Sequence, residues 1–259
     1  MPFMYPVLNH AEHDESLRNL CALAVMAKAP RAGKVKTRLA PPLTLEQSAA
    51  LNICFLRDTT ENIASVAANG GAAGLICYTP VGDEAAFDGL LPEGFALIAQ
   101  RGDGFGERLL AAAEDILACG FGAVCLIDSD SPTLPVQALR AAVDELSRPG
   151  DRVVLGGSDD GGYYLIGLKQ AHAAPFQNIT WSTASVFAET VRQVKDAGLE
   201  LVELPVWYDV DDAATLAVLE RELLDGERPK FAAVGGADGS VDGYDAKATR
   251  EFLRARAEA

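Results

Sequence analysis

The chain has 259 residues, of which 49% are hydrophobic and 23% are charged. This composition is typical of globular proteins, so it excludes global disorder and provides enough apolar residues for a full core. The 22 basic and 37 acidic side chains give a formal charge of −15. Because so acidic a surface repels phosphate backbones, nucleic acid is disfavoured as the main partner.

Residues 1–20 lack the basic stretch and apolar run of a secretory signal, and we expect them to form a loosely ordered arm. No apolar run approaches the roughly 20 residues of a membrane span, so no membrane partner is expected. None of the five cysteines forms a CxxC pair, and the three histidines have no ligand spacing with them. We therefore expect reduced core cysteines, no zinc site and a cytoplasmic protein.

Strand and helix patterns alternate through the first part of the chain. In order, the sequence predicts a strand at 21–27, a helix at 45–68, a strand at 74–78, a short helix at 83–90, a strand at 95–99, a helix at 106–118, a strand at 123–127 and a helix at 135–147. The runs CALAVMA and AVCLI are apolar throughout, as in strands that are buried on both faces.

The alternation changes after residue 150. Strands are predicted at 152–155 and 163–168 with no helix between them, followed by a helix at 183–197, a strand at 199–204, a helix at 212–224, a linker at 234–243 and a charged helix at 244–257. The last helix could pack on the domain or mediate a homodimer.

This order of elements predicts the α/β class, as a single-domain three-layer αβα fold with a mostly parallel mixed sheet. The expected organisation is an arm at 1–20, a nucleotide-binding domain at 21–226, and a linker with a C-terminal helix at 227–259. Ligands of such sheets bind beyond the carboxyl ends of the strands, so we expect the chemistry just after residues 27, 78, 99, 127 and 168.

The loop after the first strand is the first candidate site. Five of the eleven residues at 28–38 are basic, in a chain with few basic residues. Glycine and proline let the backbone wrap an anion, and lysine and arginine neutralise it, which predicts a phosphate-binding loop rather than a solvated surface loop. It is not a Walker A loop, because Lys28 stands where that motif needs its first glycine. The expected contacts are Lys28, Ala29, Arg31, Gly33, Lys36, Thr37 and Arg38.

Acidic pairs form the second group of candidates. Asp128 and Asp130 directly follow the strand at 123–127, where two carboxylates could hold Mg²⁺ or Mn²⁺ together with phosphate oxygens; alternatively, Asp130 caps the next helix. Asp209 and Asp211 precede the helix at 212–224, and we expect one residue of the acidic run there to cap that helix and another to reach the metal.

Glycine-rich and hydroxyl-rich segments complete the set. The turn Asp160, Gly161, Gly162, Tyr163 would let a ligand approach the backbone, although an ordinary β-turn explains it as well. Gln100 and the segment Gly106, Glu107, Arg108 could contact a base or ribose. In Trp181, Ser182, Thr183, a hydroxyl is expected to cap the helix at 183–197, whose N-terminus could bind an acceptor anion.

Together these motifs resemble a known family. AKAPRAGKVKTRLAP at 27–41, GERL at 106–109, DSPTLP at 130–135, DGGYYLIGL at 160–168, WST at 181–183 and DVD at 209–211 occur in this order in the DUF2064 group. That group lies in the glycosyltransferase-A-like, nucleotide-diphospho-sugar transferase superfamily. Some of its members carry the label of transferases associated with radical-SAM, selenodomain or arsenosugar gene clusters.

The basic loop is also similar to that of the 2-phospholactate and molybdenum-cofactor nucleotidyltransferases. By position, the resemblance implies that Arg31, Lys36 and Arg38 contact phosphates, that Asp130 holds Mg²⁺ and that Asp211 is a second ligand. This chain has Asp128 where the family usually has Gly, Gly157 where it has Pro and Asp212 where it has Thr. The additional carboxylates could alter the metal stoichiometry.

The function expected from these residues is an Mg²⁺-dependent nucleotidyltransferase, with Lys36, Arg38 and Asp130 as the catalytic residues. Its partners would be a nucleoside triphosphate and a small-molecule acceptor carrying a phosphate or phosphonate. A glycosyltransferase that uses a nucleotide sugar is the first alternative, and a non-catalytic nucleotide-binding protein is the second.

Overall fold

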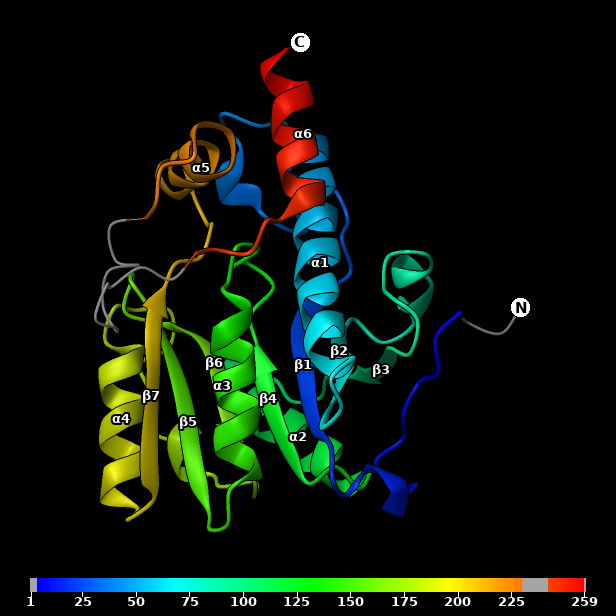
Figure 1. Ribbon diagram of the computed structural model, residues 1–259, viewed down its shortest axis with the longest axis vertical. Coiled ribbons are helices and arrows are strands. Elements are labelled where there is room, and N and C mark those ends of the chain that lie inside the picture. Colours follow the sequence, from blue (N-terminus) through cyan, green and yellow to red (C-terminus); the bar gives the residue numbers. More distant parts are fainter. Residues whose placement is uncertain (1–3, 230–241, 259) are drawn as a thin grey trace.

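The computed structural model describes residues 4–229 and 242–258. These residues form a seven-stranded sheet with helices on both faces (Figure 1). The strands are β1 (Cys21–Lys28), β2 (Ala72–Thr79), β3 (Ala96–Ala99), β4 (Ala123–Ile127), β5 (Arg152–Ser158), β6 (Tyr163–Leu168) and β7 (Glu200–Trp207). The α-helices are α1 (Leu45–Ala67), α2 (Phe105–Ala118), α3 (Val136–Ser147), α4 (Val186–Asp196), α5 (Ala213–Glu220) and α6 (Lys247–Ala257). The single-domain αβα fold expected from the sequence is confirmed.

The strand order is β3-β2-β1-β4-β6-β5-β7. All neighbouring pairs are parallel except those that involve β6, which runs antiparallel to both β4 and β5. The sequence permits this because only a short turn joins β5 to β6, and a parallel connection needs a crossover of a dozen residues or more. The mixed, mostly parallel sheet is therefore as predicted.

Alternate residues of the central strands pack on opposite faces of the sheet. On β1, Leu23 and Val25 belong to the core under α1 and α3, while Ala22 and Ala24 belong to the core under α2 and α4. Each face is thus covered by a helical layer, which explains why these strands are apolar at every position rather than at every second one.

The direction of β6 corrects one expectation about the site. Leu168 ends an antiparallel strand and therefore lies at the edge opposite to the carboxyl ends of the parallel strands. The prediction of chemistry just after residue 168 is wrong for this reason. The beginning of β6, at Tyr163, lies at the carboxyl edge instead, and it brings the preceding glycine-rich turn to the same place as the loops after β1 and β4.

Several helix boundaries also differ from those predicted. The helix expected at 83–90 is the short 3-10 helix η3 (Glu84–Phe87), and the last helix of the domain is α5 followed by one π-helical turn (η5, Arg221–Asp225). The predicted linker at 234–243 lies almost wholly outside the described residues. The helix expected from 183 begins at Val186, its N-cap residue is Ser185, and Ser182 has a positive φ of 63°. Capping by Ser182 or Thr183 is therefore wrong.

The N-terminal segment is attached to the domain rather than loosely ordered. Val7 forms a parallel bridge with Leu97 of β3, and the buried Tyr5 hydroxyl donates to the carbonyl oxygen of Leu91 at 2.7 Å. The expectation of a loose arm is wrong for residues 4–20, because the side chain of Tyr5 is buried and the backbone pairs with the sheet edge.

The C-terminal helix packs on the domain, along α1 (Figure 1). Its first turn carries no side-chain cap of its own; instead Asp58 of α1 accepts hydrogen bonds from the backbone N–H groups of Ala248 (2.9 Å) and Thr249 (2.8 Å). Asp58 is buried, and Leu253 of α6 is buried against the core. A carboxylate at a helix N-terminus satisfies unpaired donors and complements the helix dipole.

All five cysteines are free, and Cys21, Cys77, Cys119 and Cys125 are buried while Cys54 is half-buried. Among residues 4–229 and 242–258, no helix combines the length and the apolar character needed to cross a bilayer.

We expect Asp58→Ala to lower the free energy of unfolding by about 1–3 kcal/mol, since it leaves two N–H groups of a packed helix unsatisfied. Denaturant unfolding measures this directly. Asp144→Ala, at an exposed position of α3, is the matched control and should stay within about 0.5 kcal/mol of the parent protein. Equal losses for the two variants would contradict the capping role.

Candidate functional site

The basic loop after β1 turns back on itself and directs one lysine inward. Gly33 has a φ of 71°, and Lys34 N donates to the carbonyl oxygen of Arg31 at 2.9 Å, which closes a turn. Lys36 also has a left-handed backbone, with a φ of 47°, immediately before the 3-10 helix η2 (Thr37–Leu39). A left-handed conformation is uncommon for a residue with a side chain, and it costs about 1 kcal/mol or more.

The side chain of Lys36 joins three parts of the chain. Its ammonium lies 2.7 Å from Asp130 Oδ1, 2.8 Å from Asp211 Oδ1 and 2.7 Å from the carbonyl oxygen of Val210, and it is 5% exposed. Burial lowers the pKa of Lys36, but the charges of the two carboxylates outweigh burial and hold the pKa above its usual value. The lysine is therefore charged and bound between two strand ends.

Arg38 reaches the same cluster from the solvent side. Its guanidinium donates to Asp211 Oδ2 while its side chain stays 72% exposed. Burial raises the pKa of Asp211, but Lys36 and Arg38 together lower it below the usual value. Asp211 thus accepts from two cations of the basic loop.

The neighbouring carboxylates are poorly compensated. Burial, and then the charge of Asp130, raises the pKa of Asp128 well above its usual value, although Ser131 Oγ donates to Asp128 Oδ2 at 2.7 Å. Burial raises the pKa of Asp209 to about 7, with further contributions from the charges of Asp160, Asp211 and Asp130. The site therefore carries more negative charge than its own cations balance.

These acidic groups suit a hard divalent cation by their chemistry. Carboxylate oxygens are the ligands that Mg²⁺ and Mn²⁺ prefer, and a dication would relieve the repulsion among the carboxylates, which adds to burial in raising the pKa of Asp209. Within the described part of the chain, however, no three His, Cys, Asp or Glu side chains gather as a ready-made metal cluster. The assignment of Asp128, Asp130, Asp209 and Asp211 to a metal stays a prediction. The structure excludes the alternative that Asp130 caps α3, since the N-cap residue is Pro135.

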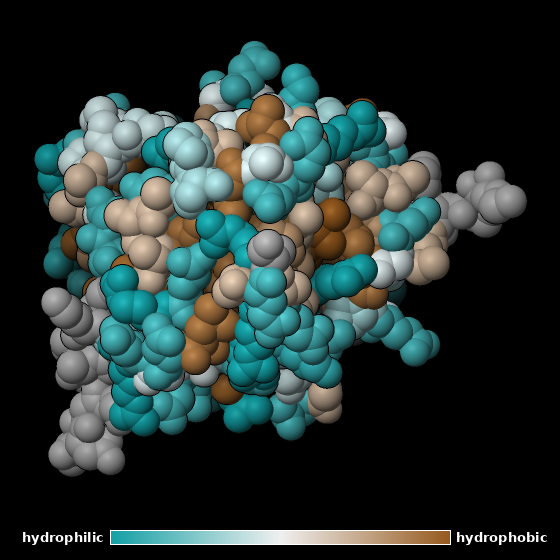
Figure 2. Space-filling model, turned by 90° about the horizontal axis from the view of Figure 1, so that it is seen from above, coloured by the Kyte–Doolittle hydropathy of each residue, from teal (hydrophilic) through white to brown (hydrophobic). Residues whose placement is uncertain are grey.

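Two pockets adjoin at this edge of the sheet, which Figure 2 views from above; apolar surface lies there in hollows between hydrophilic side chains. The smaller pocket, of about 280 Å³, is basic and is lined by Met26, Lys28, Lys34, Val35, Lys36, Thr37, Arg38, Ser129, Asp130 and Asp211. The larger, of about 370 Å³, shares Met26, Arg38 and Asp211 with it. We call them the basic pocket and the aromatic pocket.

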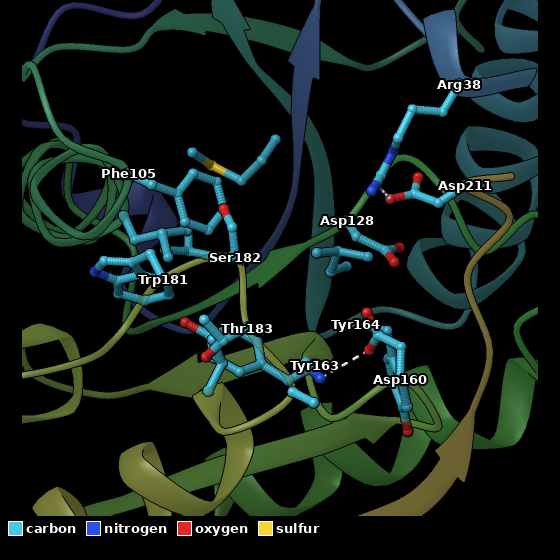
Figure 3. A pocket seen from close by; sticks show the side chains of 17 residues that line it. Arg38, Phe105, Asp128, Asp160, Tyr163, Tyr164, Trp181, Ser182, Thr183 and Asp211 are labelled. Carbon is cyan, nitrogen blue, oxygen red and sulfur yellow. Dashed lines mark hydrogen bonds and ion pairs between the residues drawn. The ribbon is translucent and has the colours of Figure 1, made fainter.

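The aromatic pocket has two unlike sides (Figure 3). On one side Phe105 packs edge-to-face on Trp181 with ring centroids 5.1 Å apart, and Tyr163 packs on Trp181 at 6.4 Å. Asp128 and Arg38 lie on the other side. Among the described lining residues, Arg38 is the one cationic side chain.

The turn between β5 and β6 lines this pocket with Asp160 and Gly162, and hydrogen bonds fix its conformation. Asp160 Oδ1 accepts from Gly162 N at 2.7 Å, and Phe187 N at the start of α4 donates to the carbonyl oxygen of Gly161 at 2.8 Å. Gly161 has a φ of 91°, and a Cβ there would lie 2.2 Å from the carbonyl oxygen of Ala184. The β-turn expected from the sequence is present, and it also lines the pocket.

The structure brings most of the predicted residues together and places some elsewhere. Ser182 and Thr183 line the aromatic pocket, and Gly106 lies against the indole of Trp181. Glu107 accepts from Asp103 N and Gly104 N as part of the α2 cap. Other residues that were expected to contact the nucleotide contact the protein instead. Arg31 pairs with Asp83, Gln100 donates to the carbonyl oxygen of Cys77, and the Arg108 guanidinium lies over the ring of Phe105. The side chain of Ala29 is buried.

Several contributors to the site were not predicted from the sequence, Lys34 of the basic loop among them. Met26 lines both pockets from within β1, Phe105 forms the aromatic wall, and the carbonyl oxygen of Val210 accepts from Lys36. Phe105 is the first residue of α2 and is 46% exposed. The signal available in the sequence was a phenylalanine between two glycines, directly before a predicted helix. The carbonyl oxygen of Val210 could not be predicted as an acceptor, because every residue has a backbone carbonyl group.

The basic loop and the carboxylates at the carboxyl edge of the mixed sheet suit a ligand that carries phosphate groups, and solved structures of nucleotide-dependent transferases share this fold. The comparisons with known proteins agree. Residues 62–183 match the family model described as "Uncharacterized protein conserved in bacteria (DUF2064)", which confirms the resemblance found in the sequence. No curated protein matches the sequence.

Solved structures extend the likeness to almost the whole chain. A candidate nucleotide-diphospho-sugar transferase from Desulfovibrio desulfuricans G20 is 29% identical, covers 91% of this chain and 97% of its own, and has a TM-score of 0.72. CMP:2-keto-3-deoxy-manno-octonic acid synthetase is 12% identical over 80% of this chain and 100% of its own, with a TM-score of 0.51. A nucleotidyl transferase from Methanothermobacter thermautotroptrophicus is 12% identical over 81% and 100%, also at 0.51. The last two show the fold alone.

We expect Gly161→Ala to destabilise the protein by about 3 kcal/mol or more, since the new Cβ would combine backbone strain with a collision against the chain at Ala184. Gly198→Ala is the matched control: Gly198 also has a positive φ, of 71°, but open space around it, so only about 1 kcal/mol of strain is expected. Thermal unfolding compares the two. A loss at Gly161 no larger than at Gly198 would show that the turn yields easily.

Asp209 predicts a dependence of stability on pH. Its pKa in the folded protein is about 7, above its ordinary value of 3.8. Between these values the folded state binds the extra proton, so this group lowers stability as the pH rises from about 4 to 7. Without divalent cations, Asp209→Asn should raise the free energy of unfolding by about 1–2 kcal/mol at pH 8 and have little effect at pH 4. An equal effect of the substitution at both pH values would contradict the shifted pKa.

Proposed function

We propose that the protein is a divalent-cation-dependent nucleotidyltransferase that joins a nucleoside triphosphate to a small molecule bearing a phosphate or phosphonate. The observation that carries the proposal is the junction of the two pockets at Arg38 and Asp211. A basic pocket suits a triphosphate, and a second pocket that opens onto it leaves room for an acceptor beside the transferred group.

The basic pocket supplies the charge that a triphosphate needs. Lys28, Lys34, Lys36 and Arg38 all line it, in a chain whose overall charge is −15. Such a concentration of cations at the carboxyl edge of a mostly parallel sheet is the physical basis of phosphate binding. The CMP:2-keto-3-deoxy-manno-octonic acid synthetase structure, which has this fold, is complexed with CTP.

In the proposed reaction, an oxygen of the acceptor's phosphate or phosphonate forms a bond to the α-phosphorus. The bond between that phosphorus and the oxygen bridging to the β-phosphorus breaks, and pyrophosphate leaves with the electron pair. Arg38 lines both pockets and would balance the charge of both substrates. Little covalent chemistry falls to the protein, so the rate would come from positioning and charge compensation.

A divalent cation is part of the proposal. Asp130 and Asp211, with Asp128 and Asp209 beside them, would hold Mg²⁺ or Mn²⁺, which when bound supplies neutralisation of the phosphate oxygens. Their hard oxygen donors and their surplus of negative charge support this assignment.

A glycosyltransferase that uses a nucleotide sugar is the second candidate. Two observations favour it: the likeness to the candidate nucleotide-diphospho-sugar transferase, and a pocket with an aromatic wall facing carboxylates. Aromatic faces pack on the apolar side of a sugar ring, and carboxylates accept hydrogen bonds from its hydroxyl groups.

A thermal-shift panel with the four nucleoside triphosphates and the corresponding nucleotide sugars, each with and without Mg²⁺, separates the two. A ligand at about 100 times its dissociation constant adds roughly 2.7 kcal/mol of stability. Mg²⁺-dependent stabilisation by one triphosphate is the result expected here. Stabilisation only by a nucleotide sugar would favour the glycosyltransferase, and no response to any nucleotide would contradict both.

With the triphosphate so identified, we expect Lys36→Ala and Asp130→Asn each to lower the rate of pyrophosphate release, as kcat/KM, by about 100-fold or more. Lys36→Ala removes a cation that the proposal assigns to the phosphates, and Asp130→Asn removes a carboxylate that it assigns to the divalent cation. Lys195→Ala is the control, since Lys195 is exposed in the last turn of α4. Unchanged ligand affinity and turnover in both site variants would indicate that this edge is not the reactive site.

A further inference from the structure

The ammonium of Lys36 is fully occupied by the protein itself. A lysine has three N–H donors, and three oxygens lie at hydrogen-bonding distance: Asp130 Oδ1, Asp211 Oδ1 and the carbonyl oxygen of Val210, at 2.7, 2.8 and 2.7 Å. The side chain is 5% exposed, and the ring of Phe55 lies 5.7 Å from the ammonium. This arrangement is a complete cation site whose cation is supplied by the chain.

The two carboxylates that hold Lys36 are those proposed as metal ligands. Each gives one oxygen to the ammonium, and Arg38 takes the second oxygen of Asp211. A dication that bound these carboxylates would have to displace the ammonium or lie beside it. Two like charges a few ångströms apart in a partly buried site repel strongly.

The displaced ammonium needs another anion, because its surroundings leave it little contact with water. The basic pocket provides the place for one: Lys36 lines it together with Lys28 and Lys34, which are cations themselves. Among ligands that fit a pocket of lysines, phosphate groups can accept the hydrogen bonds that the carboxylates give up.

We propose that Lys36 is an internal counter-cation that keeps a divalent metal out of the Asp130–Asp211 pair until the phosphates of a nucleotide draw its ammonium away. Metal and nucleotide then bind with positive coupling, each strengthening the other, because both require the same movement of one side chain. The inference rests on the proposed function for the role of the two aspartates as metal ligands. Lys36 has two partners in turn: carboxylates in the free protein and phosphates in the complex.

The test is the affinity of the nucleotide-free protein for Mn²⁺ alone, measured from the electron paramagnetic resonance signal of the free ion. We expect Lys36→Met to bind Mn²⁺ at least 10-fold more tightly than the parent protein, since it opens the carboxylates. Lys34→Met is the matched control: Lys34 is exposed and lines the same pocket, so the variant removes one local charge but not the ion pair, and a change below about 3-fold is expected.

A double variant locates the metal. Asp130→Asn added to Lys36→Met should return Mn²⁺ affinity to the parent level or below, because it removes one of the two freed carboxylates. Lys36→Gln, which keeps hydrogen-bond donors without the charge, is a second variant with less effect on packing, and it should also gain affinity. Thermal melts confirm that each variant compared is folded.

Lys36→Met and Lys36→Gln that bind Mn²⁺ no better than the parent protein would overturn the inference, as would an equal gain in Lys34→Met. The metal measurement is independent of catalysis, so the two proposals can fail separately. A gain in Mn²⁺ affinity without any turnover of triphosphates would leave the counter-cation role standing and reject the nucleotidyltransferase. Turnover of triphosphates without a gain in Mn²⁺ affinity would reject the counter-cation role and leave the nucleotidyltransferase standing.

Discussion

The salt bridge from Lys36 to Asp130 and Asp211 is the interaction on which the candidate site depends. It connects the loop after β1 to the end of β4 and to the segment before α5, and the two ends of its longest link are 175 positions apart in the sequence. A buried ion pair costs solvation, so it persists only where geometry and further hydrogen bonds compensate. Here three acceptors surround one ammonium, and Lys36 keeps a left-handed backbone to reach them.

The order of the strands makes this meeting possible. β4 lies directly beside β1, so the basic loop and the first acidic pair leave the sheet side by side. β6 is inserted next to β4 in the opposite direction, which brings the turn before Tyr163 to the same edge. One reversed strand thus places the aromatic pocket beside the basic one. Arg38 and Asp211 line both pockets, and this shared boundary is what makes transfer between two substrates the natural interpretation of the site.

Charge is distributed unevenly within this edge. The protein as a whole is strongly acidic, and burial, followed by the repulsion of neighbouring carboxylates, raises the pKa values of Asp128 and Asp209. The basic loop faces that cluster and is partly neutralised by it. Such an arrangement is poised between two sets of partners, since an added dication would satisfy the carboxylates and an added polyphosphate would satisfy the lysines.

The sequence by itself determined the fold class, most of the strands and the residue types of the site, because apolar runs, glycine turns and local charge clusters are local signals. The loop at 28–38, Asp130 and the turn after Asp159 were all recognisable in this way. One residue of the acidic run before α5 was expected to cap that helix, and Asp212 does so. Only the tertiary structure decided that Lys36 is the buried lysine and that Leu168 lies at the edge opposite to the site. Each of these depends on strand direction or on a contact between distant segments, and the chain pattern around a residue carries no information about its partner across the sheet.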